Sequence, residues 1–329
     1  MSYLHSLKKL LGNFGINGYL IPKNDEFFSE YASPDRLNIV SNFSGSAGLA
    51  IILKEKNYLF VDGRYTIQAL REAGKFFEVC EVPKNNIREI TKKFNIKWQI
   101  GYDPKLFTKK FLSKNFSRDL NLIPINNNLV DLVTKKNSKL RNLKKFYILN
   151  KNIVGQSHEK KIQILSEILK KNKIDNIFIS APENVAWLLN MRGHDNPFSP
   201  IPNCKIIMSK NKKIYFFADK YKFENIKRKK IFKNIEFFDD IKFYSVLSNM
   251  YGKNCSIDEN SCSIFYENLI KSKFEIIKRE DPCYHLKSIK NKIEIKNSVK
   301  AHNEDGVALT KFLFQIKNTK KRLDEILLE

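Results

Sequence analysis

The N-terminal region alternates short apolar runs with polar turns, which predicts a small α/β unit. A helix is expected over residues 4–14, followed by a strand over residues 18–22. Two further apolar runs, 48–53 and 58–62, flank a polar turn and predict a hairpin, because β-branched and aromatic runs bounded by polar turns are the usual signal of strands. A second helix is expected to begin near Tyr65.

The same order of elements recurs about 156 residues further along the chain. Apolar residues at helical spacing predict a helix over 159–171, and a strand is expected over 176–180. The runs 205–209 and 214–219 predict another hairpin, and a helix is expected after Tyr221. This repeat of element type and spacing indicates two α/β domains of similar plan.

Two breaks in the pattern indicate domain boundaries. A run rich in Asn and Lys interrupts the periodicity between about residues 124 and 151. A second boundary is expected near Pro282. We therefore expect a first domain, a linker, a second domain and a C-terminal helical segment, at residues 1–128, 129–150, 151–283 and 284–329 respectively.

The C-terminal segment has a helical pattern throughout. From residue 286 to about residue 317, apolar positions recur at intervals compatible with one face of a single long helix, namely Ile289, Ile293, Val299, Val307, Phe312, Leu313 and Ile316. Such a helix needs a partner for its apolar stripe, because intrinsic propensity seldom stabilises an isolated helix in water. The candidates are the preceding domain, another copy of the chain, and a partner outside the chain.

The composition is that of an ordinary globular protein with a strong positive charge. Hydrophobic residues make up 42% of the chain, charged residues 29%, and the net charge is +24. The lysines are scattered without a single stripe or tail, which favours solvated lysines replacing other polar residues, so no nucleic-acid partner is expected. A polyanion-binding face is the alternative, and it requires lysines clustered beside exposed aromatic residues.

Targeting signals and cysteine usage indicate a cytoplasmic protein. The longest apolar runs, such as residues 49–53, are far shorter than the roughly 18 residues that span a bilayer, so no membrane partner is expected. The N-terminus lacks the apolar stretch and cleavage site of a signal peptide. The five cysteines form no C-x-x-C motif, which is typical of buried thiols in a reducing compartment and argues against a zinc site.

The common hydrolase motifs are absent from the sequence. It contains no G-x-S-x-G, no H-E-x-x-H and no Walker A pattern. His158 and Glu159 begin a zinc-protease-like motif, but the second histidine is missing, so we interpret them as the polar start of a helix. We therefore expect no catalytic residue and no metal ligand in this chain.

Arg64 is the candidate binding residue. It lies in the segment Asp62-Gly-Arg-Tyr65, where a strand ends and a helix begins, and a guanidinium at such a position can bind a carboxylate or a carbonyl. The corresponding turn of the repeat, residues 219–221, has no arginine, which indicates a role beyond packing. The alternative is a structural ion pair with Asp62 or Glu30.

Two other segments have compositions that suit a binding surface. The small residues of the loop 43–48 allow close backbone approach, so this loop is either an anion cradle or a tight turn before a strand. The segment 192–200 is rich in turn-forming residues and could line a cleft. Trp187, just before it, is expected in the core.

Taken together, these segments resemble the N-terminal part of the three-domain Xaa-Pro aminopeptidases, which are creatinase-like or pita-bread metallopeptidases. The matching stretches run in family order over essentially the whole chain: Ser29-Glu-Tyr31, Asn42-Phe-Ser-Gly-Ser-Ala-Gly48, Asp62-Gly-Arg-Tyr65 with Gln68-Ala69, Asn128-Leu-Val-Asp131, Glu183-Asn-Val-Ala-Trp187, Asn190-Met-Arg-Gly193, Leu286-Lys-Ser-Ile-Lys290 and Ala301-His-Asn-Glu-Asp-Gly-Val-Ala-Leu309.

The resemblance implies an α/β fold with two creatinase N-terminal-like domains that have mixed sheets, followed by the first long helix of an incomplete pita-bread catalytic domain. In that family, the catalytic domain holds two divalent metals, usually manganese, and hydrolyses the bond before a proline in the second position of a peptide. The family's metal ligands have no counterpart in these 329 residues. Arg64 matches the arginine by which the family's first domain reaches the bound peptide.

We therefore expect an N-terminal fragment of a metal-dependent Xaa-Pro aminopeptidase that is inactive alone. A homodimer is a further expectation from the resemblance, although much of the family's dimer contact involves the catalytic domain. Without that domain, six apolar residues of the C-terminal segment would be partly exposed: Phe312, Leu313, Ile316, Leu323, Ile326 and Leu327. The alternative functions are a non-catalytic interaction subunit and a degenerate relative of the family.

Overall fold

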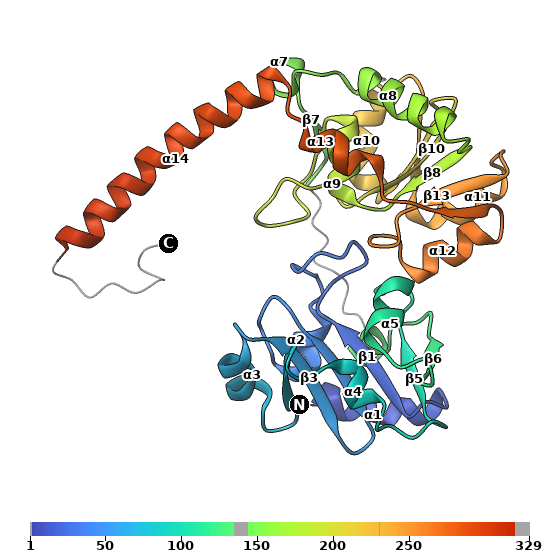
Figure 1. The fold of residues 1–329 in the computed structure, drawn as a ribbon, viewed down its shortest axis with the longest axis vertical. Helices are drawn as coiled ribbons and strands as arrows, with labels where there is room; N and C mark the ends of the chain where they lie inside the picture. The colour runs from blue at the N-terminus through green and yellow to red at the C-terminus, as the bar shows by residue number, and fades with distance from the viewer. Residues whose placement is uncertain (1, 135–143, 230, 320–329) are drawn as a thin grey trace.

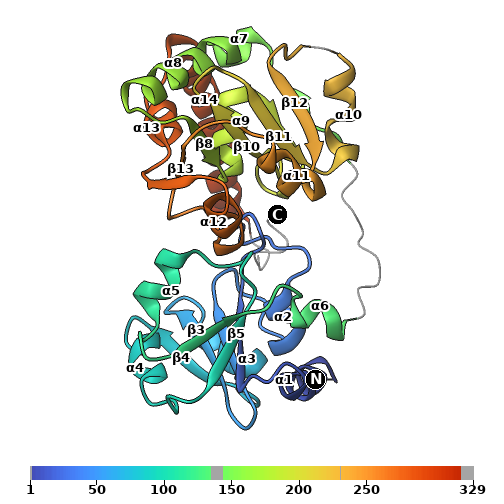
Figure 2. The ribbon, with the colours of Figure 1, turned by 90° about the vertical axis from the view of Figure 1, so that its right-hand side faces the viewer.

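The computed structural model describes residues 2–134, 144–229 and 231–319. Two α/β lobes follow each other along the chain, and a long helix extends away from the second lobe (Figure 1). A view turned by 90° shows the same two lobes one above the other (Figure 2). Among the described residues, no helix combines the length and the apolar character needed to cross a membrane.

The first lobe contains a six-stranded sheet in the order β4-β3-β2-β1-β5-β6. Strands β1, β2 and β3 are antiparallel, whereas β4, β5 and β6 join in parallel. The central strands β1, β2 and β3 are buried on both faces, which explains their continuous apolar runs in the sequence. The strand predicted at residues 18–22 and the hairpin predicted at 48–62 are confirmed. The bounds are Gly18–Pro22 (β1), Leu49–Leu53 (β2), Asn57–Asp62 (β3), Glu78–Val82 (β4), Gln99–Tyr102 (β5) and Asn121–Pro124 (β6).

Helices cover both faces of this sheet. Helices α1, α2, α3 and α6 pack against one face around the buried Leu7 and Leu37, and α4 and α5 pack against the other face around Phe107 and Phe116. The predicted helices at 4–14 and near Tyr65 are confirmed as α1 and α3. The bounds are Ser2–Asn13 (α1), Arg36–Ser41 (α2), Thr66–Ala73 (α3), Ile87–Thr91 (α4), Lys109–Asn115 (α5) and Leu129–Val133 (α6).

The second lobe repeats this arrangement with a sheet in the order β12-β11-β10-β8-β13-β14. Its middle strands β8, β10 and β11 are antiparallel and its outer strands join in parallel, as in the first lobe. The predicted internal repeat is therefore confirmed at the level of strand order and direction. The bounds are Asn176–Ile179 (β8), Lys205–Ser209 (β10), Ile214–Ala218 (β11), Ile235–Asp239 (β12), Asn254–Ile257 (β13) and Glu275–Lys278 (β14).

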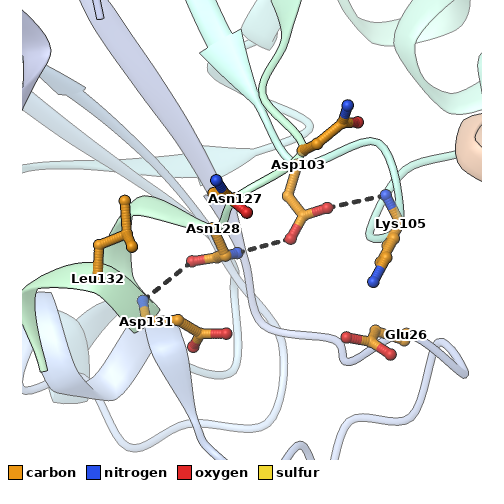
Figure 3. A pocket seen from close by; sticks show the side chains of 8 residues that line it. Glu26, Asp103, Lys105, Asn127, Asn128, Asp131 and Leu132 are labelled. Carbon is orange, nitrogen blue, oxygen red and sulfur yellow. Dashed lines mark hydrogen bonds between the residues drawn. The ribbon is translucent and has the colours of Figure 1, made fainter. Parts of the chain in front are cut away.

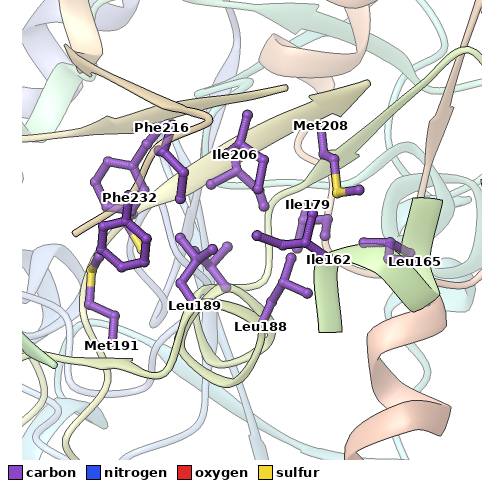
Figure 4. Packing of buried hydrophobic residues seen from close by; sticks show 14 of the residues in the cluster. Ile162, Leu165, Ile179, Leu188, Leu189, Met191, Ile206, Met208, Phe216 and Phe232 are labelled. Carbon is purple, nitrogen blue, oxygen red and sulfur yellow. The ribbon is translucent and has the colours of Figure 1, made fainter. Parts of the chain in front are cut away.

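The core of the second lobe forms where helices α8 and α9 meet the sheet. Ile162 and Leu165 of α8 pack with Leu188 of α9 and with Ile206 and Met208 of β10 (Figure 4). Two short strands, β7 and β9, pair beside this core. The bounds are Tyr147–Ile148 (β7), Lys151–Val154 (α7), His158–Lys171 (α8), Pro182–Leu189 (α9), Met191–Arg192 (β9), Lys220–Arg228 (α10), Asp240–Lys242 (the 3₁₀ helix η1), Phe243–Ser248 (α11) and Ile264–Lys271 (α12).

The two lobes contact each other through the start of α12 and the region around α5. The backbone N–H of Ile264 donates to the carbonyl of Phe107 at 2.9 Å, and the Ile264 side chain joins the core of the first lobe. Lys109 also forms an ion pair with the buried Glu267, with 2.8 Å between Nζ and Oε1. These contacts fix one edge of the junction between the lobes.

The prediction of a single long helix from residue 286 onward is wrong, because the structure has two helices in this segment. Helix α13 spans Pro282–Ser288 and α14 spans Lys292–Asn318. Ile289 adopts an extended backbone, and the Asn291 side chain then accepts from the N–H groups of Ile293 and Glu294. An asparagine that caps the backbone in this way begins a new helix instead of continuing the previous one.

The expected exposure of the C-terminal stripe is confirmed within the described part of the chain. No residue of α14 is buried, and Leu313 for example is 49% exposed. Phe312 and Ile316 are also partly exposed, whereas Leu323, Ile326 and Leu327 lie outside the described residues. All five cysteines are buried free thiols, as expected.

The region between the lobes contains residues of both cores. Leu129 and Val130 of α6 are buried in the first lobe, whereas Phe146 is buried in the second. The domain limits given above stay a prediction.

Candidate functional site

Arg64 lies on the surface of the first lobe, in the turn between β3 and α3. Its Nε and Nη2 atoms donate to the two carboxylate oxygens of Asp62, at 3.1 and 2.8 Å, and the Arg64 backbone N–H also donates to Asp62. The guanidinium lies 5.0 Å from the centre of the Tyr65 ring, and the side chain is 71% exposed. The hydrogen bond from Arg64 lowers the pKa of Asp62.

The structural ion pair between Arg64 and Asp62, one of the two sequence interpretations, is thus present. It occupies one edge of the guanidinium and holds the side chain against the Tyr65 ring. Because the exposed side chain extends into solvent, the other edge of the guanidinium remains accessible to a ligand. The role of Arg64 in substrate binding stays a prediction.

The loop 43–48 is a tight turn that is held by a carboxylate of helix α3. The Ser44 N–H donates to Glu72 at 2.8 Å, and the Ser44 hydroxyl donates to the other oxygen of Glu72 at 2.9 Å. A Cβ atom at Gly45 would lie 2.3 Å from the Phe43 ring, so glycine is required there. The Ser44 N–H, which an anion cradle would offer to a ligand, already donates to the Glu72 carboxylate. The geometry therefore favours a tight turn over an anion cradle.

A polar hollow of about 410 Å³ lies where β1, β5 and β6 end (Figure 3). Asp103 follows β5 and is only 3% exposed, and its carboxylate accepts from the Lys105 N–H and from the Asn128 side chain, both at 2.9 Å. Burial raises the pKa of Asp103. Glu26, from the segment after β1, and Asp131 also line the hollow.

The N-terminus of α6 forms one wall of this hollow. The Asn128 side chain caps the helix by accepting from the N–H groups of Val130 and Asp131. Arg36 in turn binds the Asp131 carboxylate through two hydrogen bonds of 3.0 Å. Asp103 thus joins the end of β5 to α6, and Asp131 joins α6 to α2. The carboxylates around the hollow offer hydrogen-bond acceptors to a small polar ligand.

A second hollow of about 300 Å³ lies between the lobes. It is lined by residues 27–31 of the first lobe, by Pro182 and Glu183 at the start of α9, and by Asn196, Ile201 and Asn203 before β10. The prediction that the segment 192–200 could line a cleft is confirmed for Asn196.

Sequence reasoning missed several residues of these sites. Asp103 and Glu26 were given no role, although each lies shortly after the end of a strand that enters the hollow, which is the signal that could have found them. Outside the two hollows, Lys161 of α8 was also missed. It is 1% exposed, donates to the Trp187 carbonyl and the Asn190 side chain, and has its pKa lowered to about 8 by burial. Trp187 itself packs partly buried against the core.

No metal site is formed by residues 2–134, 144–229 and 231–319. Within these ranges, no three His, Cys, Asp or Glu side chains lie together in a way that could hold a metal ion. His158, which begins the incomplete zinc-protease-like motif, is the first residue of α8, and Ser157 caps that helix. Its interpretation as the polar start of a helix is confirmed.

Two segments of the chain match the family described as Creatinase/Prolidase N-terminal domain, at residues 4–132 and 137–294. A probable Xaa-Pro aminopeptidase P of Laccaria bicolor is 28% identical and aligns with 94% of this chain and 50% of its own length. Xaa-Pro aminopeptidase 1 of Dictyostelium discoideum is 26% identical, with 94% and 52% covered. The chain spans about half the length of these curated relatives.

The fold also matches a solved structure. The X-prolyl aminopeptidase of Caenorhabditis elegans, described as a cytosolic enzyme with a di-nuclear active site, superposes with a TM-score of 0.90 over 99% of this chain and 58% of its own. The sequence identity is 24%, so this likeness concerns the fold. With the two matched segments covering both lobes, the chain belongs to the creatinase/prolidase N-terminal-domain family and corresponds to the N-terminal part of an aminopeptidase P.

Proposed function

We propose that this chain provides the two N-terminal lobes of a Xaa-Pro aminopeptidase, an enzyme that removes the residue preceding proline from the N-terminus of a peptide. The observation that carries the proposal is the continuous match of relatives bearing that name to at least 91% of the chain, through both lobes and into the segment beyond them. A shared fold alone would not indicate a shared activity.

The hydrolytic centre of this enzyme is proposed to lie in the half of the relatives that these 329 residues do not span. We propose that it holds two divalent metals, with manganese as the metal to test first. The described residues do not fit a metal pair, so no step of the reaction is assigned to them. We further propose that the enzyme acts in the cytoplasm and forms a homodimer.

Arg64 is the residue through which the first lobe is proposed to bind the peptide. Its exposed guanidinium is oriented by Asp62 and Tyr65 and would donate hydrogen bonds to a carbonyl or carboxylate oxygen of the substrate. Because Asp62 already balances the charge of Arg64, orientation of the peptide is the larger expected contribution, and charge neutralisation the smaller one.

The function is tested with a fusion protein. Residues 1–291 replace the matching N-terminal part of the Dictyostelium relative, and a Gly-Pro-type peptide is supplied with Mn²⁺. We expect hydrolysis that a chelator abolishes, no hydrolysis of a matched Gly-Ala peptide, and none by the 329-residue chain alone. Chelator-sensitive turnover by the isolated chain would contradict the placement of the hydrolytic centre.

A non-catalytic interaction subunit is the second candidate function. It is favoured by α14, whose 27 residues include no buried side chain and therefore offer a long face for association. Co-purification of the chain with a separately encoded catalytic half, without peptidase activity in the complex, would support this candidate over the first.

A further inference from the structure

The hollow between the lobes has walls of an unusual local structure. The segment after β1 turns around Asp25, whose carboxylate accepts from the N–H groups of Phe27 and Ser29 at 2.8 and 3.0 Å. This turn places Phe28 at φ 58°, in the left-handed region that bulky residues seldom adopt. Backbone strain of this kind tends to persist where a binding site requires it.

Aromatic rings form much of the lining. Phe27, Phe28 and Tyr31 all border the hollow, and the Tyr31 ring lies 5.0 Å from the ring of Phe198 across the junction of the lobes. Phe198 is 75% exposed, so this pair lies at the surface, beside the hollow. The faces of such rings carry negative electrostatic potential and attract organic cations.

The same segment already binds one cation of the protein. The Nζ atom of Lys205, a buried residue of the second lobe, lies 3.7 Å from the centre of the Phe27 ring. Lys205 contacts the Phe27 ring. Phe28 and Tyr31 also line the hollow and offer two further rings to a ligand.

The charge of the lining is acidic. Glu30 and Glu183 line the hollow, and of the described residues that line it none is Lys, Arg or His. This contrasts with the net charge of +24 for the whole chain. Glu183 accepts a hydrogen bond from the Tyr284 hydroxyl at 3.0 Å, which holds its carboxylate in place without neutralising it.

We propose that this hollow is a binding site for a primary ammonium or guanidinium group carried on a peptide, that is, for a Lys or Arg side chain. The rings of Phe28 and Tyr31 would contact the charged group, and Glu30 and Glu183 would balance its charge. The volume of about 300 Å³ suits one such side chain. The proposal does not depend on peptidase activity, because binding is measured on the chain alone.

The test is calorimetric titration of the 329-residue chain at low ionic strength with N-acetyl-arginine amide, and with N-acetyl-citrulline amide as the uncharged analogue of the same shape. We expect the arginine compound to bind at least about tenfold more tightly, and less tightly as salt is added. Absence of binding, or equal binding of the two compounds, would overturn the proposal.

Variants locate the site. Glu30→Gln and Tyr31→Leu are each expected to weaken binding about fivefold without lowering the melting temperature. Glu89→Gln is the matched control, because Glu89 is an exposed glutamate of α4 that pairs with Lys92 and does not line the hollow. An equal loss in Glu89→Gln would overturn the proposal, since binding would then reflect overall charge.

A last comparison identifies the source of the cation. N-acetyl-lysine amide is titrated beside n-butylamine, which carries the same ammonium group without the peptide unit. Tighter binding of the lysine compound is expected and supports a peptide side chain as the ligand. Equal affinity would overturn the peptide part of the proposal and identify a free amine as sufficient.

Discussion

Arg36 and Asp131, which are 95 positions apart in the sequence, form a paired contact between α2 and α6 in which Nε and Nη2 donate to the two carboxylate oxygens at 3.0 Å each. Both side chains are largely shielded from solvent. The contact closes the first lobe, because it joins the helix that follows β1 to the helix that leads out of the lobe.

Removing one partner of this pair is expected to be costly. Asp131→Asn leaves the buried Arg36 without its counter-charge and should reduce the free energy of unfolding of the first lobe by about 3 kcal/mol. The measurement is urea denaturation followed by near-ultraviolet circular dichroism. The double variant Arg36→Met with Asp131→Leu should recover much of this loss, because no charge then stays buried. A double variant no more stable than Asp131→Asn would contradict this account.

Arg64 should affect substrate binding much more than stability. In the fusion protein described above, Arg64→Ala is expected to raise KM for a Gly-Pro-type peptide about tenfold, because a charge-assisted hydrogen bond to the peptide is lost. The free energy of unfolding should stay close to that of the natural chain, since the pair with Asp62 is exposed and screened by solvent.

Arg118→Ala serves as the control for Arg64, because Arg118 is an exposed arginine of the first lobe in a different loop. It should leave both KM and stability unchanged. An equal rise of KM in the two variants would mean that general charge, and not the position of Arg64, attracts the peptide.

Lys161 should give the second lobe a stability that depends on pH. Burial lowers its pKa from 10.5 to about 8, so between these values the unfolded chain binds more protons than the folded chain. The free energy of unfolding therefore gains a contribution that rises from pH 8 to pH 10.5, on the order of 3 kcal/mol in total.

The measurement compares the natural chain with Lys161→Met by urea denaturation at several pH values. Other groups titrate alike in both proteins, so the difference between the two isolates Lys161. The stability of the natural chain relative to the variant should increase with pH above 8 and stay level below it. A difference that stays constant over the whole range would show that the folded protein does not depress this pKa.

The duplicated α/β architecture could be predicted from the sequence because both sheets are covered on two faces. Strands buried in this way leave continuous apolar runs, as in β2 and β10, and polar turns separate them clearly. The outer strands were not predicted. For example, β14 has only four residues, and its two half-buried isoleucines lie between exposed charged residues, so it leaves no continuous buried apolar run.

The candidate sites were harder to predict because their residues come together from distant parts of the chain. Asp103 and Asn128 meet only after β5 and β6 have paired, and Glu30 meets Asn196 only when the lobes are in contact. Arg64 was identified because it lies in a short motif, Asp62-Gly-Arg-Tyr65, whose counterpart in the repeat has no arginine. The break before α14 depended on a single side chain, Asn291, whose capping role overrides a helical pattern of apolar residues.

This capping role leads to a prediction about how α14 is held. The Asn291 side chain donates to the Val154 carbonyl at 2.9 Å while it caps α14, and Glu294 accepts from the Asn291 N–H to complete a capping box. Asn291→Ala should therefore destabilise the first turn of α14 by about 1 kcal/mol, because both the cap and the contact with α7 are lost.

Hydrogen exchange measures this effect directly. In Asn291→Ala the amides of residues 293–297 should exchange about fivefold faster, since a loss of 1 kcal/mol corresponds to that factor. Asn318→Ala, at the other end of the same helix, is the control, because the Asn318 side chain donates to the Phe314 carbonyl of the last turn. If both variants accelerate exchange equally in the first turn, the helix is held by its overall propensity, and the cap does not determine where it begins.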